Sequence, residues 1–339
     1  MRKALVLGAA GQDGSYLCEL LLDQGYLVTG GVRRTSSLLR TNLDGISNSC
    51  FNLKYFDMSD AQSIQALIRT TQPDEIYNLA AQSHVGISFT IPHYTASIDA
   101  LATISILESI RDINPEIRLY QASSSEMFGD SNGIALSETS EMNPRSPYGA
   151  AKVFAYNLVK IYRTSYGLIS SNGILFNHES PRRADNFVTK KIVNGAVRFI
   201  KDGIPLVLGN LDSKRDWGHA KDYCAGMILI NNYKHADDWV LATGTQYSVR
   251  NFVEITFKLL GVSITWEGTG DREVGVDAKS GKVAIKVSDV YMRPWDVTDL
   301  IGDSSKARSL LGWSQSYTFE NLIDEMVSNS LAVYDRGLL

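Results

Sequence analysis

The sequence predicts an α/β fold, a doubly wound parallel sheet of the Rossmann type with a smaller C-terminal α/β lobe. Short apolar runs alternate with segments of helical spacing over the first half of the chain, as in a parallel sheet covered by helices. A glycine-rich turn, Gly8–Gly14, follows the first apolar run, and three serines, Ser123–Ser125, follow the fifth. Both places belong to the carboxyl edge where such sheets bind ligands. With 339 residues, 44% of them hydrophobic, the chain can bury a full core.

Six buried strands are expected in the first part of the chain, at Lys3–Leu7, Leu27–Val32, Lys54–Phe56, Glu75–Leu79, Arg118–Ala122 and Ser170–Phe176. Helices are expected between them, at Ser15–Asp23, Ala61–Thr70, Thr95–Ile110 and Tyr148–Tyr166. After His178 the pattern loosens, with a helix at Tyr223–Asn231 and a strand at Trp239–Ala242 returning to the sheet.

The remaining residues are expected to form the smaller lobe, with a helix at Val249–Leu260 and a loop at Glu267–Gly281. The predicted division therefore places residues 1–177 and about 212–245 in a dinucleotide-binding domain. Residues 178–211 and 246–339 form a substrate domain.

Composition excludes several functional classes. The net charge is −4 and no long basic stretch suggests nucleic-acid binding. No apolar run reaches the length of a membrane span, and Met1–Leu7 is too short for a signal peptide. The cysteines Cys18, Cys50 and Cys224 lie far apart, which favours a reducing, cytoplasmic compartment. His178 has no metal-ligand spacing around it, so no metal is expected.

The glycine-rich turn predicts a dinucleotide phosphate site. Gly8, Gly11 and Gly14 are spaced three apart, between the first strand and the first helix. This context lets a pyrophosphate approach the backbone at the positive end of a helix. NAD enzymes usually carry an acidic residue after the second strand, whereas this chain has Arg33-Arg34-Thr35-Ser36. Forked guanidinium donors suit a 2′-phosphate, so NADP is predicted over NAD, the alternative being a solvated basic turn.

Tyr148 and Lys152 lie four apart on one helix face and predict oxidation of a hydroxyl group. A nearby ammonium and the charge of a nicotinamide would both favour the phenolate, which can then accept a proton. Ser124, at the end of the fifth strand, can hydrogen-bond the same hydroxyl. Glu126 exceeds what a simple reductase needs, and could remove the C5 proton of a 4-keto sugar. Its alternative role is that of a helix cap or solvated carboxylate.

These residues carry a specific resemblance. Tyr148…Lys152 with the glycine turn resembles the extended short-chain dehydrogenase/reductases and, more narrowly, the GDP-mannose 4,6-dehydratase family. The matching strings are GQDGSYL at 11–17, VRRTSS at 32–37, YNLAAQSHV at 77–85, QASSSEMFG at 121–129, RSPYGAAK at 145–152, ILFNHESPRR at 174–183, LGNLDSKRDWGHAKDY at 208–223 and RPWDVTDLIGDSSKA at 293–307. They span nearly the whole chain.

The resemblance implies a lyase that retains NADP through one turnover and converts GDP-mannose to a 4-keto-6-deoxy sugar nucleotide. It implies catalytic roles for Ser124, Glu126, Tyr148 and Lys152. The implied cofactor contacts are Gly8, Gly11, Gln12, Asp13, Gly14, Arg33, Arg34, Thr35, Ser36, Asp57, Met58, Leu79, Ala80, Ala81, Ser83, Tyr94, Lys152, His178 and Arg183. The implied substrate contacts are Ser83, Ser124, Glu126, Tyr148, Asn177, Asn186, Lys191, Arg215 and Arg293.

The resemblance further implies a homodimer or homotetramer, because the loop Arg34–Asn42 resembles a segment that reaches a neighbouring subunit's cofactor. The chain departs from the family at Ser124, where a threonine is usual, and at Trp295, Asp296 and Thr298. These departures leave open a related substrate such as GDP-manno-heptose. A sugar-nucleotide epimerase or reductase, and a regulator that only senses NADP, are the other interpretations. The intact set of four catalytic residues argues against the sensor.

Overall fold

The computed structural model describes residues 1–35, 42–292 and 295–339. Its largest sheet consists of β1 (Lys3–Leu7), β2 (Leu27–Val32), β3 (Phe51–Tyr55), β4 (Glu75–Asn78), β5 (Arg118–Ser124), β6 (Ser170–Leu175) and β10 (Asp238–Leu241). The order across the sheet is β10-β6-β5-β4-β1-β2-β3, and all neighbouring strands are parallel. The order reverses between β1 and β4, which is the topological switch point of a Rossmann sheet. The predicted fold class is confirmed.

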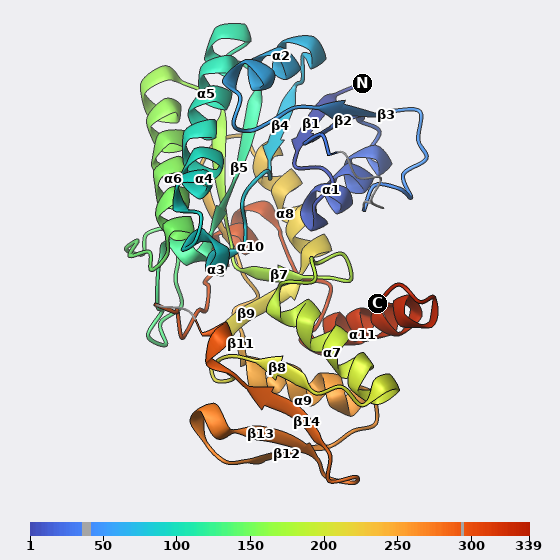
Figure 1. Cartoon of the computed structure of the whole chain (residues 1–339). Helices are drawn as coiled ribbons and strands as arrows, with labels where there is room; N and C mark the ends of the chain where they lie inside the picture. Colours follow the sequence, from blue (N-terminus) through green and yellow to red (C-terminus); the bar gives the residue numbers. More distant parts are fainter. Residues whose placement is uncertain (36–41, 293–294) are drawn as a thin grey trace.

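Helices cover both faces of this sheet (Figure 1). On one face α1 (Gln12–Asp23) packs against α8 (Ala220–Asn232), and on the other α2 (Ala61–Thr71), α5 (Ala102–Ile113) and α6 (Pro147–Tyr166) lie side by side. Leu17 and Met227 are fully buried in the first layer, and Ile64, Leu107 and Val159 in the second. Most residues of β1, β4, β5 and β6 are buried, and short apolar runs within these strands made them predictable.

A second region lies beyond the carboxyl edge of the sheet (Figure 1). It contains a three-stranded sheet of β7 (Asn177–Glu179), β9 (Lys214–His219) and β11 (Gln246–Ser248). A four-stranded sheet follows the order β12 (Ile264–Glu267), β13 (Val274–Asp277), β14 (Val283–Val287) and β8 (Leu206–Leu208). Helices α7 (Val188–Asp202), α9 (Val249–Leu259) and α11 (Phe319–Asp335) pack together around Phe252, Phe257 and Leu322.

Short elements complete the chain: α3 (Val85–Ser88), α4 (Pro92–Ala96), the π-helix η1 (Ser97–Leu101), the 3-10 helices η2 (Ser125–Met127), η3 (Gly270–Arg272) and η4 (Asp289–Tyr291), and α10 (Ser305–Leu311), which packs against β10. None of the helices in the described ranges is both long and apolar enough to cross a lipid bilayer.

Two predictions about secondary structure were wrong. The expected helix Thr95–Ile110 is three segments, since α4 leads into the π turn η1 before α5 begins. The expected loop Glu267–Gly281 contains β13, which pairs with β12 on one side and β14 on the other. Only Val274 and Val276 mark this strand in the sequence, and the glycines and charged residues around them hide it.

Candidate active site

A cavity of about 940 Å³ runs along the carboxyl edge of the seven-stranded sheet and continues to α7, β8 and β9 of the second region. The predicted residues that line it are Gly8, Gly11, Gln12, Asp13, Gly14, Arg33, Asp57, Met58, Leu79, Ala80, Ala81, Ser83, Tyr94, Ser124, Glu126, Tyr148, Lys152, Asn177, His178, Arg183, Asn186, Lys191 and Arg215. Arg34 and Thr35 are exposed and do not belong to the lining. The predicted residues Ser36 and Arg293 lie outside the described residues.

The glycine turn places the N-terminus of α1 in this cavity. Gly11 is the N-cap of this helix and no described side chain caps it by a hydrogen bond, so the backbone N–H groups of the first turn are available to an anion. A Cβ at Gly14 would lie 2.3 Å from the carbonyl oxygen of Gly8. Glycine is therefore the residue that lets α1 pack this closely on β1. The uncapped helix end and the close packing fit a dinucleotide pyrophosphate.

Asp13 and His178 form a partly buried ion pair at this helix end. Nε2 of His178 lies 2.8 Å from Oδ2 of Asp13, and Nδ1 lies 2.7 Å from the carbonyl oxygen of Phe176. Both neighbours are acceptors, so both ring nitrogens must carry protons and the imidazole is charged. Burial lowers the pKa of His178, but Asp13 and the Phe176 carbonyl outweigh it and the pKa is raised. Burial acts to raise the pKa of Asp13, but the charge of His178 holds it below its usual value.

The adenosine side of the cavity carries Arg33 and Tyr94. The Nη1 atom of Arg33 donates to the phenol oxygen of Tyr94 at 3.0 Å. Both side chains are exposed, so they can reorient toward a ligand. Asp57 accepts bonds from the backbone and hydroxyl of Ser59, which hold the pKa of Asp57 low.

Ser124, Glu126 and Tyr148 are buried side chains in the middle of the cavity. Burial raises the pKa of Tyr148, and the charges of Asp99 and Glu126 raise it further. A hydrogen bond with Ser124 and the charge of Arg183 act in the opposite direction. Among the described residues the effects that raise the pKa outweigh those that lower it, so the expected lowering needs a further positive charge beside the phenol, in addition to that of Lys152.

Lys152 is held one turn beyond Tyr148. Its ammonium donates to the carbonyl oxygen of Ala122 at 3.0 Å and lies 5.6 Å from the centroid of the Tyr148 ring. Only 4% of Lys152 is exposed. Burial lowers the pKa of this lysine, and the carboxylate of Asp99 opposes that shift.

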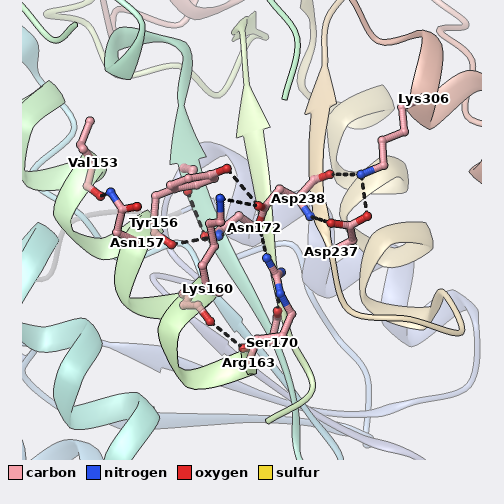
Figure 2. Close-up of polar contacts among 12 residues, drawn as sticks. Val153, Tyr156, Asn157, Lys160, Arg163, Ser170, Asn172, Asp237, Asp238 and Lys306 are labelled. Carbon is pink, nitrogen blue, oxygen red and sulfur yellow. Dashed lines mark hydrogen bonds and ion pairs between the residues drawn. The ribbon is translucent and has the colours of Figure 1, made fainter. Parts of the chain in front are cut away.

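Contacts near the start and in the middle of helix α6 hold Tyr148 and Lys152 in position. At its start, the Cβ of an alanine at Gly149 would lie 2.6 Å from the backbone oxygen of Glu126, so glycine allows α6 to approach η2. Further along, Tyr156 donates to Oδ2 of Asp238 at 2.9 Å, and Arg163 binds Oδ1 at 2.9 Å. Figure 2 shows this network, in which Asn172 of β6 also donates to Asp238. The network locks α6 to β6 and β10.

Cationic side chains of the second region line the far end of the cavity. Nζ of Lys191 lies 3.0 Å from the ring centroid of Tyr291. Arg215 approaches Asp296, with Nη2 at 3.5 Å from Oδ1. Arg183 pairs with Glu179 at 3.0 Å. All three cations line the same cavity, and such donors suit a diphosphate.

Some cavity residues were not predicted. Tyr291, Phe187 and His84 line the wall, and the His84 and Phe187 rings lie 5.4 Å apart. Asp99 lies behind the wall and acts on both Lys152 and Tyr148. The only sequence signal for Asp99 is an acidic residue within the apolar run Ile98–Leu101.

Comparison with known proteins shows the family of this chain. The family model of GDP-mannose 4,6 dehydratase matches residues 5–326. The chain therefore belongs to the GDP-mannose 4,6-dehydratase family. A GDP-mannose 4,6-dehydratase of Sinorhizobium fredii (strain HH103) is 47% identical over 344 residues, covering 98% of this chain and 97% of the relative. The GDP-mannose 4,6 dehydratase of Homo sapiens is 45% identical over 335 residues, covering 96% of this chain and 90% of the relative.

Solved structures of other proteins share the fold of this family member. A UDP-glucose 4-epimerase of Thermus thermophilus, in complex with NAD, has a TM-score of 0.81 at 22% identity and covers 99% of this chain and 100% of that chain. A dTDP-glucose 4,6-dehydratase of Bacillus anthracis str. Ames, also in complex with NAD, has a TM-score of 0.81 at 20% identity and full coverage of both chains. At these identities the likeness shows the Rossmann-type architecture.

Proposed function

We propose that this chain is a GDP-mannose 4,6-dehydratase, a hydro-lyase that forms GDP-4-keto-6-deoxy-mannose. Family membership gives the substrate class, and one observation about the site carries the reaction. Ser124, Glu126 and Tyr148 are buried in the wall of one cavity, which also contains Lys152 and the uncapped end of α1. A dehydrogenase needs only the serine, tyrosine and lysine, whereas the additional buried carboxylate suits an elimination.

The cofactor of this reaction is proposed to be NADP. Gly8, Gly11 and Gly14 would hold the pyrophosphate, and Arg33, exposed at the cavity edge, would meet the 2′-phosphate. When bound, the nicotinamide dinucleotide supplies a reversible hydride acceptor and a positive charge beside Tyr148. Arg34, Thr35 and Ser36 follow Arg33 directly in the sequence and are proposed to add donors for the 2′-phosphate.

In the first step Tyr148 accepts the proton of the O4 hydroxyl as C4 is oxidised to the ketone. Ser124 hydrogen-bonds the same oxygen, and Lys152 stabilises the phenolate by its charge. The 4-keto group acidifies the C5 proton, which Glu126 removes. Glu126 then protonates the C6 hydroxyl, which leaves as water. The hydride given up at C4, which a bound nicotinamide dinucleotide would hold, would return to C6, and the proton held by Tyr148 to C5, so that C6 becomes a methyl group. Lys191, Arg215 and Arg293 would hold the diphosphate, and Asn177 and Asn186 the sugar side.

Substrate panels test the activity. We expect incubation with GDP-mannose, without added reduced cofactor, to give a product lighter by one water, with no net cofactor turnover. GDP-manno-heptose, dTDP-glucose and CDP-glucose serve as comparison substrates. Net consumption of reduced cofactor would instead indicate a reductase. Preferential dehydration of the heptose would reassign the sugar while keeping the reaction.

Glu126→Gln tests the role that separates a dehydratase from a dehydrogenase. We expect this variant to retain oxidation at C4, measured as isotope exchange there, and to stall before water is lost. The amide keeps the shape of the side chain but cannot accept the C5 proton. Equal loss of both steps would show that Glu126 only supports the site.

We propose a homodimer or homotetramer as the working assembly. The large apolar side chains Leu101, Phe154 and Ile161, on η1 and α6, are 43% to 52% exposed. Burying such a surface between subunits is favourable. Light scattering of the purified chain gives its mass directly, and a monomer at micromolar concentration would contradict this. Most of the loop Arg34–Asn42, expected to reach a neighbouring subunit, lies outside the described residues.

Two further predictions remain proposals. The division into residues 1–177 with about 212–245, and 178–211 with 246–339, assigns the cofactor to the first part and the sugar nucleotide to the second. A cytoplasmic location accords with the three cysteines, which are all described and are free thiols.

A further inference from the structure

Asp99 is a buried carboxylate to which the proposed mechanism gives no role. It lies in the π-helix η1, and only 2% of its surface is exposed. Its neighbours Ile98 and Ala100 are each 5% exposed, so three consecutive residues face the interior. A π turn widens the helix and often occurs at functional sites. Here the π turn directs Asp99 toward the interior, between the buried apolar residues Ile98 and Ala100.

One oxygen of Asp99 is anchored and the other is not. Oδ1 accepts a hydrogen bond from the backbone nitrogen of Gln82 at 2.7 Å. Gln82 belongs to the cavity wall, in the stretch Leu79–Ser83 that follows β4. Oδ2 is fully buried and has no hydrogen-bond partner within residues 1–35, 42–292 and 295–339. A carboxylate with a buried, unpaired oxygen is costly unless a nearby charge compensates it.

The compensating charge comes from α6, which packs against η1. The ammonium of Lys152 acts on Asp99, and Asp99 in turn acts on Lys152. Burial raises the pKa of Asp99 to about 6, and Lys152 and the Gln82 backbone limit that rise. The charge of Asp99 also raises the pKa of Tyr148, which lies on the same helix as Lys152. Across the cavity, Glu126 of η2 and the cation Arg183 act on Tyr148 as well.

We propose that Asp99 is a positioning residue, the counter-charge that keeps the buried Lys152 ammonium protonated in the active site. Lys152 has the Ala122 carbonyl as its hydrogen-bond acceptor, and a carbonyl carries no charge. Without Asp99 the burial of this lysine would favour its neutral form, and a neutral amine could no longer stabilise the Tyr148 phenolate. Asp99 touches neither substrate nor the reacting atoms and acts through Lys152. The inference rests on the proposed dehydratase function.

The Asp99→Asn variant tests this in the enzyme. Asparagine keeps an oxygen for the Gln82 backbone and removes only the charge. Removing a negative charge lowers the pKa of every neighbouring group, so both limbs of the bell-shaped pH profile of kcat should move to lower pH. We expect a shift of about one unit, equal to a tenfold change in rate on either limb. A purely structural role would lower stability and leave the profile in place.

Thr103→Val is the matched control. Thr103 lies on α5, is fully buried, and its hydroxyl has no partner among the described residues. This variant disturbs a buried polar group near η1 without changing charge, so its pH profile should stay that of the wild type. An unmoved profile in Asp99→Asn, or an equal shift in Thr103→Val, would overturn the proposal.

A second measurement needs no turnover. The Lys152→Met variant removes the positive charge that acts on Asp99, so the carboxyl group of Asp99 should be protonated at neutral pH. The infrared band of a protonated carboxyl should then appear, and should vanish in the double variant Lys152→Met/Asp99→Asn. Absence of this band would refute the link between Asp99 and Lys152. If the chain failed to dehydrate GDP-mannose, the proposed function would fall, and the infrared result would still decide whether these residues form a charge pair.

Discussion

Helix α6 carries the same pair of residues twice, eight residues apart, and the two copies have different surroundings. Tyr148 and Lys152 form the first copy, Tyr156 and Lys160 the second. The internal geometry is nearly the same, since the lysine nitrogen lies 5.6 Å from the tyrosine ring centroid in the first and 5.2 Å in the second. Spacing alone therefore does not distinguish a catalytic pair from a structural one.

The neighbours of the two tyrosines make the difference. Burial raises the pKa of Tyr156, and Asp238, which accepts a hydrogen bond from the phenol, raises it further and fixes its proton in place (Figure 2). Tyr148 lies in the cavity beside Ser124, whose hydrogen bond favours the phenolate. Lys160 is half exposed, whereas Lys152 is buried. The surroundings of the first copy therefore suit the proton transfer proposed for it, and those of the second copy suit an anchor for the helix.

The tyrosines give the largest expected difference. We expect Tyr148→Phe to lower the rate of GDP-mannose dehydration by about 10³-fold, because the general base is lost. Tyr156→Phe should leave the rate nearly unchanged and lower the free energy of unfolding by about 1–2 kcal/mol, since Asp238 loses a buried donor. Initial rates and urea denaturation of both variants measure this. Similar rate losses in the two would remove the functional distinction between the copies.

Substitutions of Lys152 and Lys160 should show the same contrast between lost activity and lost stability, with smaller effects. Lys152→Gln is expected to slow C4 oxidation by about 10²-fold, because the phenolate loses a fixed positive charge. Lys160→Gln removes a half-exposed partner 3.9 Å from Asp238. Its effect on stability should be below about 1 kcal/mol. Single-turnover oxidation and urea denaturation provide the two readouts, and a large activity loss in Lys160→Gln would contradict the assignment.

Asp238→Asn tests whether the second copy is a structural anchor. The carboxylate binds Tyr156, Asn172 and Arg163, and the guanidinium of Arg163 is largely buried. Removing its charge partner should cost about 3 kcal/mol of unfolding free energy. Below the unfolding transition the kcat should stay near that of the wild type. Loss of activity in fully folded protein would instead place the network within the catalytic machinery.

A charge pair outside α6 gives the smallest expected effect. The pKa of His178 is raised above 6.5, so its share of stability is complete below that pH and is lost as the pH rises through the folded value. The pKa of Asp13 is lowered, so its share is present above pH 3.8 and lost as the pH falls through the folded value. The pair should therefore stabilise the fold between these limits by about 1 kcal/mol.

Thermal unfolding from pH 5 to 9, compared with His178→Gln, isolates this contribution. The wild type should exceed the variant most at the acidic end, and the difference should shrink toward pH 9. A constant difference across this range would mean that the imidazole is not charged in the folded protein.

The sequence predicted the seven strands of the main sheet from short apolar runs between segments of helical spacing. Leu27–Val32 and Lys3–Leu7 were found at the predicted bounds. Strands of the two smaller sheets whose sequences are polar or charged were missed. Lys214–His219 reads as a charged segment and becomes β9 only because β7 and β11 pair with it. Tertiary pairing, rather than local propensity, decides such strands.

The residues of the candidate site also fall into those that could be predicted from the sequence and those that could not. Residues inside compact motifs, such as Tyr148 and Lys152, could be placed together because a helix fixes their separation. The pairing of Asp13 with His178, or of Lys191 with Tyr291, joins positions far apart in the chain, and only the fold brings them into contact. Asp99 was missed because a regular helix would not have produced the π turn that buries it.

The edge strand β10 is encoded after the chain has left the main sheet and formed β7, α7, β8, β9 and α8. During synthesis on the ribosome, β6 therefore emerges well before its partner and presents an open edge. The Asp238 network that steadies α6 is also absent until then. A nascent or truncated chain that ends before Asp238 should be prone to aggregation and a client of chaperones, and folding should be slow because its decisive contacts are long-range.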